Sequence, residues 1–152
     1  MEKKKVALVI DDEADVRAYL QAVLEDCGFD VHTAADGLTG FDAATALQPD
    51  LITLDISMPD QSGVRTYRQL KTDETLKKIP VFIITGFSDK MRIFLKKLAT
   101  FPFPEAFINK PVHPGELRKM ITEQFSGESL PHQDETPSED GAEAENANIR
   151  GK

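Results

Sequence analysis

Three absences limit the classes of protein to which this sequence of 152 residues can belong. It has one cysteine, Cys27, which excludes an intramolecular disulfide, and the helical spacing of Cys27 from Val23 and Leu24 predicts a buried thiol. It has no excess of basic residues, and its formal net charge of -8 disfavours direct binding to nucleic acid. It has no long hydrophobic run near its start, since residues 6–10 are too few for a signal-peptide core or a membrane span. We therefore expect a cytoplasmic protein with no membrane partner.

Short apolar runs alternate with amphipathic segments along most of the chain. The runs predict strands at residues 6–10, 29–34, 51–55, 81–85 and 106–109. The amphipathic segments predict helices at residues 14–27, 38–47 and 64–71, a fourth beginning at Ser88 or Asp89, and a last one from Pro114 to Phe125. This alternation predicts an α/β fold of three layers, in which helices cover both faces of a parallel sheet.

The composition changes at Ser126. Residues 126–152 contain seven acidic and two basic residues, a net charge of -5, and they lack apolar periodicity. A segment of this kind cannot bury enough apolar surface to offset the entropy of folding. We therefore expect one folded domain at residues 1–125, followed by an acidic disordered tail at residues 126–152.

Polar residues stand at the ends of four predicted strands. Asp11 and Asp12 follow the first strand, Asp55 ends the third, Thr85 ends the fourth, and Lys110 follows the fifth. Each has an ordinary alternative role, such as capping a turn or helix, occupying a strand, or carrying charge in solvent. Right-handed crossovers, however, place the carboxyl ends of all the strands at one rim of the sheet. We therefore expect these residues to form one site.

The residue types at this rim suit a phosphate group and a divalent cation. Carboxylates repel one another unless a cation neutralises them, and Mg²⁺ typically binds carboxylates while leaving positions for phosphate oxygens. Lys110 supplies a positive charge for a phosphate, and Thr85 supplies a hydroxyl donor. Asp55 is then the candidate nucleophile, because carboxylates form covalent acyl phosphates.

These motifs resemble those of the response-regulator receiver domain, the CheY-like phosphoacceptor module of two-component signalling. The resemblance covers about residues 4–125 and depends on the motifs as a set: Asp11-Asp12, Asp55 with Met58-Pro59 and Gly63, Thr85 before Gly86, and Phe107 to Pro111. It implies a flavodoxin-like (βα)5 fold with a five-stranded sheet of order 2-1-3-4-5. It also implies a cis peptide bond before Pro111.

The resemblance assigns a role to each residue at the rim. Asp55 would take a phosphoryl group from a histidine kinase or a histidine phosphotransfer protein. Mg²⁺ would be held by Asp12, Asp55 and the backbone carbonyl of Ser57, with Asp11 helping through water.

Other residues would respond to the phosphoryl group. Thr85 and Lys110 would bind its oxygens, and Phe107 would change rotamer with Thr85 as the activation switch.

Two stretches depart from the family pattern. Residues 100–105 read TFPFPE, so that Phe101 and Phe103 either tuck into the core or present a docking edge for a downstream protein beside the last helix, near Phe101 to Phe107. Phe87, two residues after Thr85, is expected to obstruct attacking water and slow self-dephosphorylation, which Phe87→Glu or Phe87→Asn would then speed.

No output domain is expected after Phe125, which suggests a stand-alone receiver that signals by protein contact or relays the phosphoryl group. Such a protein is not a turnover enzyme. One alternative is a magnesium-dependent phosphatase with an aspartate nucleophile, although Ser57 stands where those enzymes carry a second acid. The other is a pseudo-receiver that binds partners without phosphorylation.

Overall fold

The computed structural model describes residues 3–58, 62–86, 96 and 102–126. Its elements are β1 (Val6–Ile10), α1 (Ala14–Asp26), β2 (Asp30–Ala34), α2 (Gly37–Leu47), β3 (Leu51–Asp55), α3 (Ser62–Thr72), β4 (Val81–Thr85), β5 (Ala106–Asn109) and α5 (Pro114–Gln124). Nearly all of the helix expected after Ser88, and the tail beyond Ser126, lie outside the described residues. No helix in the described ranges is both long and apolar enough to cross a membrane.

The strands form one parallel sheet in the order β2-β1-β3-β4-β5, as predicted. The pairing places Ile10 beside Leu54, Asp55 beside Ile84, and Thr85 beside Asn109. The carboxyl ends of β1, β3, β4 and β5 are therefore level with one another. The residues that end or follow these strands share one rim of the sheet.

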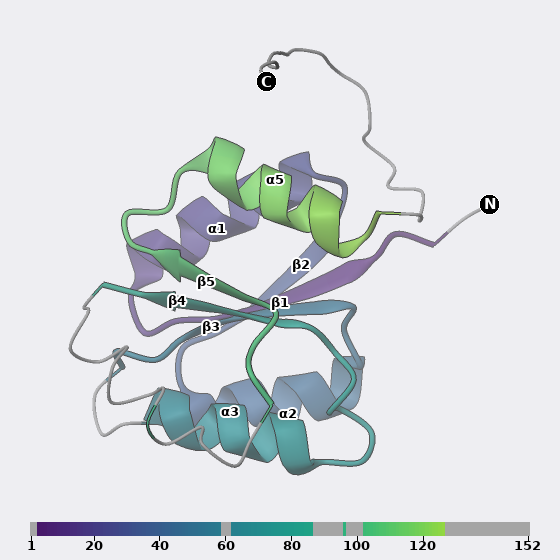
Figure 1. The fold of residues 1–152 in the computed structure, drawn as a ribbon, viewed down its shortest axis with the longest axis vertical. Helices are drawn as coiled ribbons and strands as arrows, with labels where there is room; N and C mark the ends of the chain where they lie inside the picture. The colour runs from purple at the N-terminus through teal and green to yellow at the C-terminus, as the bar shows by residue number, and fades with distance from the viewer. Residues whose placement is uncertain (1–2, 59–61, 87–95, 97–101, 127–152) are drawn as a thin grey trace, which may run out of the picture.

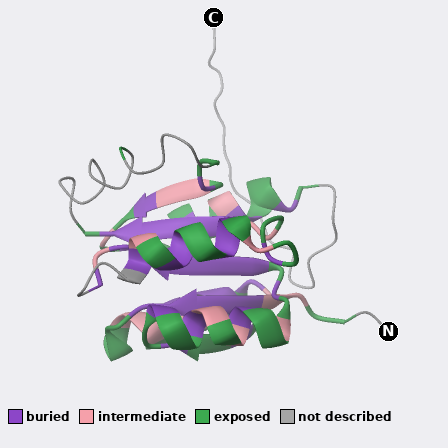
Figure 2. Ribbon diagram, turned by 90° about the horizontal axis from the view of Figure 1, so that it is seen from below, coloured by how far each residue is buried: buried purple, intermediate pink, exposed green. Residues whose placement is uncertain are grey.

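Helices cover both faces of the sheet and bury two separate apolar cores (Figure 1). α1 and α5 pack on one face, and α2 and α3 pack on the other. Every residue of β3 and β4 is buried, which explains why their sequences are continuous apolar runs rather than alternating ones (Figure 2). Cys27 is buried in the core beneath α1 and α5, as its spacing predicted.

The predicted boundaries differ from the observed ones by one or two residues. β2 begins at Asp30 instead of Phe29, whose ring turns into the core and packs edge-on against Phe125 at a centroid distance of 5.9 Å. α2 begins at Gly37, because the Asp36 side chain caps it by accepting a hydrogen bond from the Thr39 amide at 2.8 Å. These shifts leave the rim unchanged.

Candidate functional site

Three carboxylates meet where β1 and β3 end side by side. Asp11, Asp12 and Asp55 each place a carboxylate oxygen within 4.8 Å of the other two. Asp11 and Asp55 are buried, with exposed fractions of 1% and 2%, while Asp12 is exposed. The sequence prediction that these acids gather at one rim is correct, and Asp12 connects the cluster to solvent.

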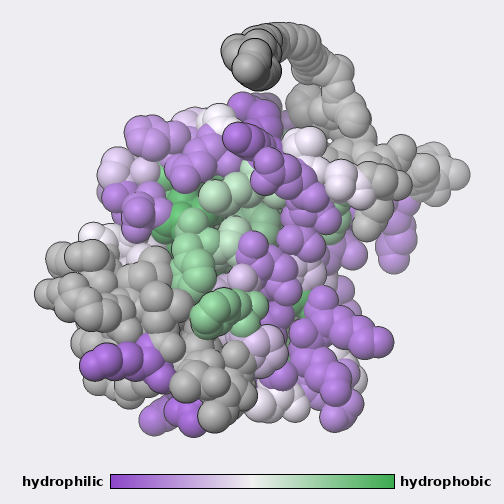
Figure 3. All heavy atoms as spheres, viewed as in Figure 1, coloured by the Kyte–Doolittle hydropathy of each residue, from purple (hydrophilic) through white to green (hydrophobic). Residues whose placement is uncertain are grey.

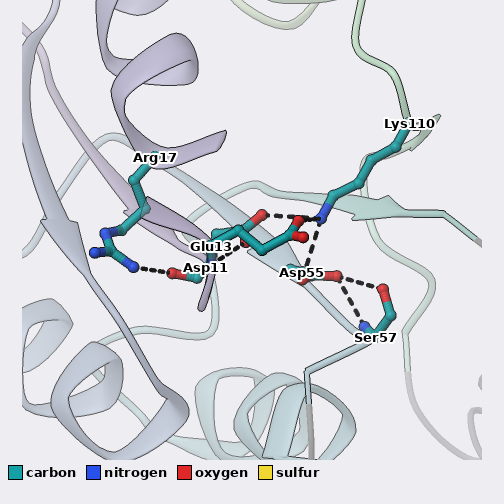
Figure 4. Close-up of polar contacts among 6 residues, drawn as sticks. All are labelled: Asp11, Glu13, Arg17, Asp55, Ser57 and Lys110. Carbon is teal, nitrogen blue, oxygen red and sulfur yellow. Dashed lines mark hydrogen bonds and ion pairs between the residues drawn. The ribbon is translucent and has the colours of Figure 1, made fainter. Parts of the chain in front are cut away.

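Lys110 crosses from the end of β5 to this cluster (Figure 4). Its Nζ donates hydrogen bonds to Glu13 Oε1 at 3.1 Å and Asp55 Oδ2 at 3.3 Å, and it lies 3.3 Å from Asp11 Oδ2. Burial would lower the pKa of Lys110, but the attraction of Asp55 and Asp11 and the hydrogen bond to Glu13 together raise it. The lysine is therefore a fixed positive charge held against the predicted nucleophile.

Ser57 holds the other oxygen of Asp55. Its backbone amide and its hydroxyl both donate to Asp55 Oδ1, at 2.8 and 2.7 Å. Lys110 and Ser57 thus contact the two carboxylate oxygens from opposite sides, consistent with the low exposure of Asp55. The predicted role of the Ser57 carbonyl stays a prediction.

Gly63 allows helix α3 to begin against the end of β3. A Cβ atom at this position would lie 2.5 Å from both the backbone oxygen of Asp55 and the Cα atom of Ile56. Any larger residue would have to displace backbone from the strand that carries Asp55. This close approach gives a physical reason for the glycine in the motif.

Thr85 and Phe107, the two predicted switch residues, lie in the neighbouring strands β4 and β5. Thr85 ends β4 and is fully buried, and its backbone oxygen accepts a hydrogen bond from the Lys110 amide at 2.9 Å. Phe107 is half-buried in the edge strand β5 and packs against the core beneath α2 and α3. Both residues therefore lie within the pair of strands that precedes Lys110, and their role as a switch stays a prediction.

Asp11 is held in a costly environment. Burial raises the pKa of its carboxyl and the nearby Asp55 charge raises it further, although the Glu13 amide donates to Asp11 Oδ1 at 2.9 Å. The second oxygen, Oδ2, is buried and lies 3.3 Å from Lys110 Nζ, an ion pair, but accepts no well-formed hydrogen bond within the described part of the chain. A buried acid oxygen whose neighbouring ammonium is shared with two other carboxylates fits a small divalent cation that prefers oxygen ligands.

Two contacts at the site were not foreseen from the sequence. Glu13 pairs with Lys110, and the Arg17 guanidinium donates to the backbone oxygen of Asp11 at 2.8 Å. Glu13 directly follows the aspartate pair, so its position was a usable signal. Arg17 offered none, because an arginine one turn into a helix is ordinary, although the fold leaves this one half-buried.

The loop that departs from the family pattern is partly described. Phe103 is 66% exposed, so the expectation that the phenylalanines tuck into the core is wrong for this residue, while Phe101 and Phe87 lie outside the described residues. The Tyr67 hydroxyl donates to Pro102 O at 2.6 Å and ties the loop to α3. Figure 3 shows apolar side chains gathered over the sheet edge between α5 and α3.

The chain is similar to known signalling proteins. A sequence profile described as the response regulator receiver domain matches residues 7–122. The chain is 34% identical over 112 residues to the polar-differentiation response regulator DivK of Brucella ovis, covering 72% of this chain and 85% of DivK. It is 33% identical over 115 residues to hybrid signal transduction histidine kinase D of Dictyostelium discoideum, covering 75% of this chain but only 7% of that kinase.

A solved structure supports the fold independently. The chemotaxis response regulator CheY4 of Vibrio cholerae matches with a TM-score of 0.69 over 80% of this chain and 98% of that one. The sequence identity is 24%, so this match speaks for the fold alone.

Proposed function

The chain belongs to the response regulator receiver domain family, and on this premise we propose that Asp55 accepts a phosphoryl group from a phosphohistidine. Receiver domains of this family interact with histidine kinases and phosphotransfer proteins. The observation that carries the proposal is the meeting of Asp55 with two further carboxylates and Lys110 at one rim. Histidine kinases and phosphotransfer proteins are accordingly the proposed donors.

In the proposed reaction, the Asp55 carboxylate forms a bond to phosphorus while the bond from phosphorus to the imidazole nitrogen breaks. The imidazole keeps the electron pair of that bond, and Asp55 becomes an acyl phosphate. Ser57 holds Oδ1 with two hydrogen bonds and so orients the carboxylate. Lys110 lies beside Oδ2, where its positive charge stabilises negative charge on the transferred group.

Magnesium is the proposed cofactor, as is typical of receiver domains. Asp11, Asp12 and Asp55 would hold the ion, with the Ser57 carbonyl as a further proposed ligand. When bound, the ion neutralises charge on the phosphoryl oxygens. The support for this assignment is the all-oxygen donor set and the buried Asp11 Oδ2, whose neighbour Lys110 is shared with Asp55 and Glu13.

We propose that the phosphorylated protein signals by contact with a downstream protein or passes the phosphoryl group on, rather than turning over a substrate. The proposed docking edge comprises Phe103 and the edge strand with Phe107. Phe103 is the exposed aromatic of this edge. Buried aromatic anchors are a common feature of protein interfaces.

The test is incubation of the full chain with Mg²⁺ and a small acyl phosphate, followed by intact mass measurement. We expect one stable phosphoryl adduct on the wild type and none on Asp55→Asn. The adduct should also disappear when the metal is chelated. Continuous release of phosphate with many turnovers would instead favour the phosphatase, and no adduct under any condition would favour the pseudo-receiver.

A further inference from the structure

The Lys110 ammonium contacts three carboxylates. Two of them, Asp11 and Asp55, belong to the proposed metal cluster, and the third, Glu13, does not. Nζ donates to Asp55 Oδ2 and to Glu13 Oε1, and lies near Asp11 Oδ2 (Figure 4). The contact with Glu13 is the shortest of the three, at 3.1 Å against 3.3 Å for the others. Glu13 therefore contributes to where the ammonium group lies.

Glu13 differs from the other two acids in its surroundings. Its side chain is 60% exposed, whereas those of Asp11 and Asp55 are 1% and 2% exposed. Glu13 occupies the N-cap position of α1, but its side chain makes no capping hydrogen bond. Replacement of its carboxylate should therefore leave the helix intact and change mainly the contact with Lys110.

We propose that Glu13 is a positioning residue that competes with the phosphoryl group for Lys110 and thereby slows phosphorylation of Asp55. This inference rests on the proposed function of Asp55. An incoming phosphoryl group needs the ammonium that Glu13 holds, and the exposed Glu13 charge repels an anionic donor at the entrance to the site. Because an exposed ion pair is weak and screened by salt, the lysine can leave Glu13 when the phosphoryl group arrives.

The experiment compares Glu13→Gln with the wild type and with Asp15→Asn, using the full chain, saturating Mg²⁺ and acetyl phosphate. Asp15 is an exposed acid in the first turn of the same helix. Asp15→Asn therefore removes one negative charge from the same region, as Glu13→Gln does. We expect Glu13→Gln to be phosphorylated about two- to fivefold faster at low salt, the range for an exposed ion pair. The gain should shrink as potassium chloride is added, and Asp15→Asn should match the wild type.

An unchanged or slower rate in Glu13→Gln would overturn the inference, as would an equal gain in Asp15→Asn or a gain that salt does not reduce. A second measurement does not depend on phosphorylation. The ¹⁵N resonance of the Lys110 ammonium in the metal-free protein should shift in Glu13→Gln and not in Asp15→Asn. Failure of the proposed function appears as no adduct on the wild type, whereas failure of this inference appears as an adduct formed at an unaltered rate in Glu13→Gln.

Discussion

At the scale of single residues, Asp11 shows how a functional group can oppose stability. Its carboxylate is buried, lies close to Asp55, and has an oxygen that accepts no hydrogen bond within the described residues. Burial and the Asp55 charge raise its pKa above the ordinary value of 3.8. The folded protein without metal would therefore be more stable with a neutral side chain at this position.

We expect Asp11→Asn to raise the free energy of unfolding of the metal-free protein at neutral pH by about 1 kcal/mol. The same substitution should weaken Mg²⁺ binding, because it removes one of the three clustered carboxylates. Urea unfolding in a chelator measures the first effect, and calorimetric titration with Mg²⁺ measures the second. A less stable variant would contradict the account of Asp11.

The pH dependence supplies a control for this prediction. Because the pKa of Asp11 is higher in the folded state, that state binds more protons than the unfolded state just above pH 3.8. The wild type should therefore lose stability from this source as the pH rises through the raised pKa. Asp11→Asn should lack this component, so its stability should fall less over the same range.

At the scale of elements, the contact between α3 and β3 depends on the absence of a side chain at Gly63. We expect Gly63→Ala to lower the free energy of unfolding by roughly 1–3 kcal/mol, because the methyl group would overlap the backbone of Asp55 and Ile56. Gly115→Ala is the matched control, since a Cβ there meets nothing within 4 Å. Equal changes of melting temperature in the two variants would show that the close approach of Gly63 to β3 does not affect stability.

The segment before β5 is attached to α3 by polar contacts with two buried residues of the helix, Tyr67 and Lys71. The buried Lys71 ammonium lies 3.4 Å from Glu105 Oε1, and the same oxygen accepts from the Val81 amide at 2.7 Å. The Tyr67 hydroxyl donates to Pro102 O, and burial followed by the Glu105 charge raises the pKa of this hydroxyl. These contacts hold the loop that presents Phe103 in one position relative to α3.

We expect Tyr67→Phe to lower the free energy of unfolding by about 1 kcal/mol, because it removes the hydrogen bond to Pro102 and leaves the ring in place. Tyr19→Phe is a matched comparison, since the Tyr19 hydroxyl donates to Val112 O at 2.7 Å from a side chain that is 40% exposed. The loss should be at least as large for Tyr19, because its acceptor residue Val112 is buried and is less open to a replacing water than the exposed Pro102. Urea unfolding of both variants decides between these expectations.

At the scale of the whole molecule, the proposed reaction site and the proposed docking edge lie at different places on the sheet. The site follows the carboxyl ends of β1, β3 and β5, whereas Phe103 precedes the amino end of β5. Phe107 lies in the strand that joins the two places. Substitutions at the loop should therefore leave the chemistry at Asp55 intact.

We expect the double substitution of Phe101→Ser and Phe103→Ser to weaken binding of the downstream partner while phosphorylation of Asp55 continues at the normal rate. The reason is the loss of the exposed aromatic ring of Phe103 at the proposed docking edge. A pull-down with the beryllofluoride-treated protein would identify the partner, and titration would compare the affinities. Unaltered affinity would place the docking surface elsewhere.

The sequence by itself determined the architecture and which strand-end residues would meet at one rim of the sheet. Strand and helix periodicities are local, so the alternation of elements followed from the residues, and the parallel sheet then placed Asp11, Asp55, Thr85 and Lys110 at one rim. The family resemblance added the strand order and the cis bond before Pro111, both of which the structure confirms.

Only the tertiary structure decided how those side chains share their contacts. Lys110 contacts Glu13 and Asp55, which lie 97 and 55 residues away in the sequence. No local sequence pattern specifies which carboxylate oxygens its ammonium group will contact. The burial of Asp55 and Asp11 and the exposure of Phe103 likewise depend on what packs around them. Periodicity fixes which face a residue occupies, whereas packing between distant elements fixes its partners.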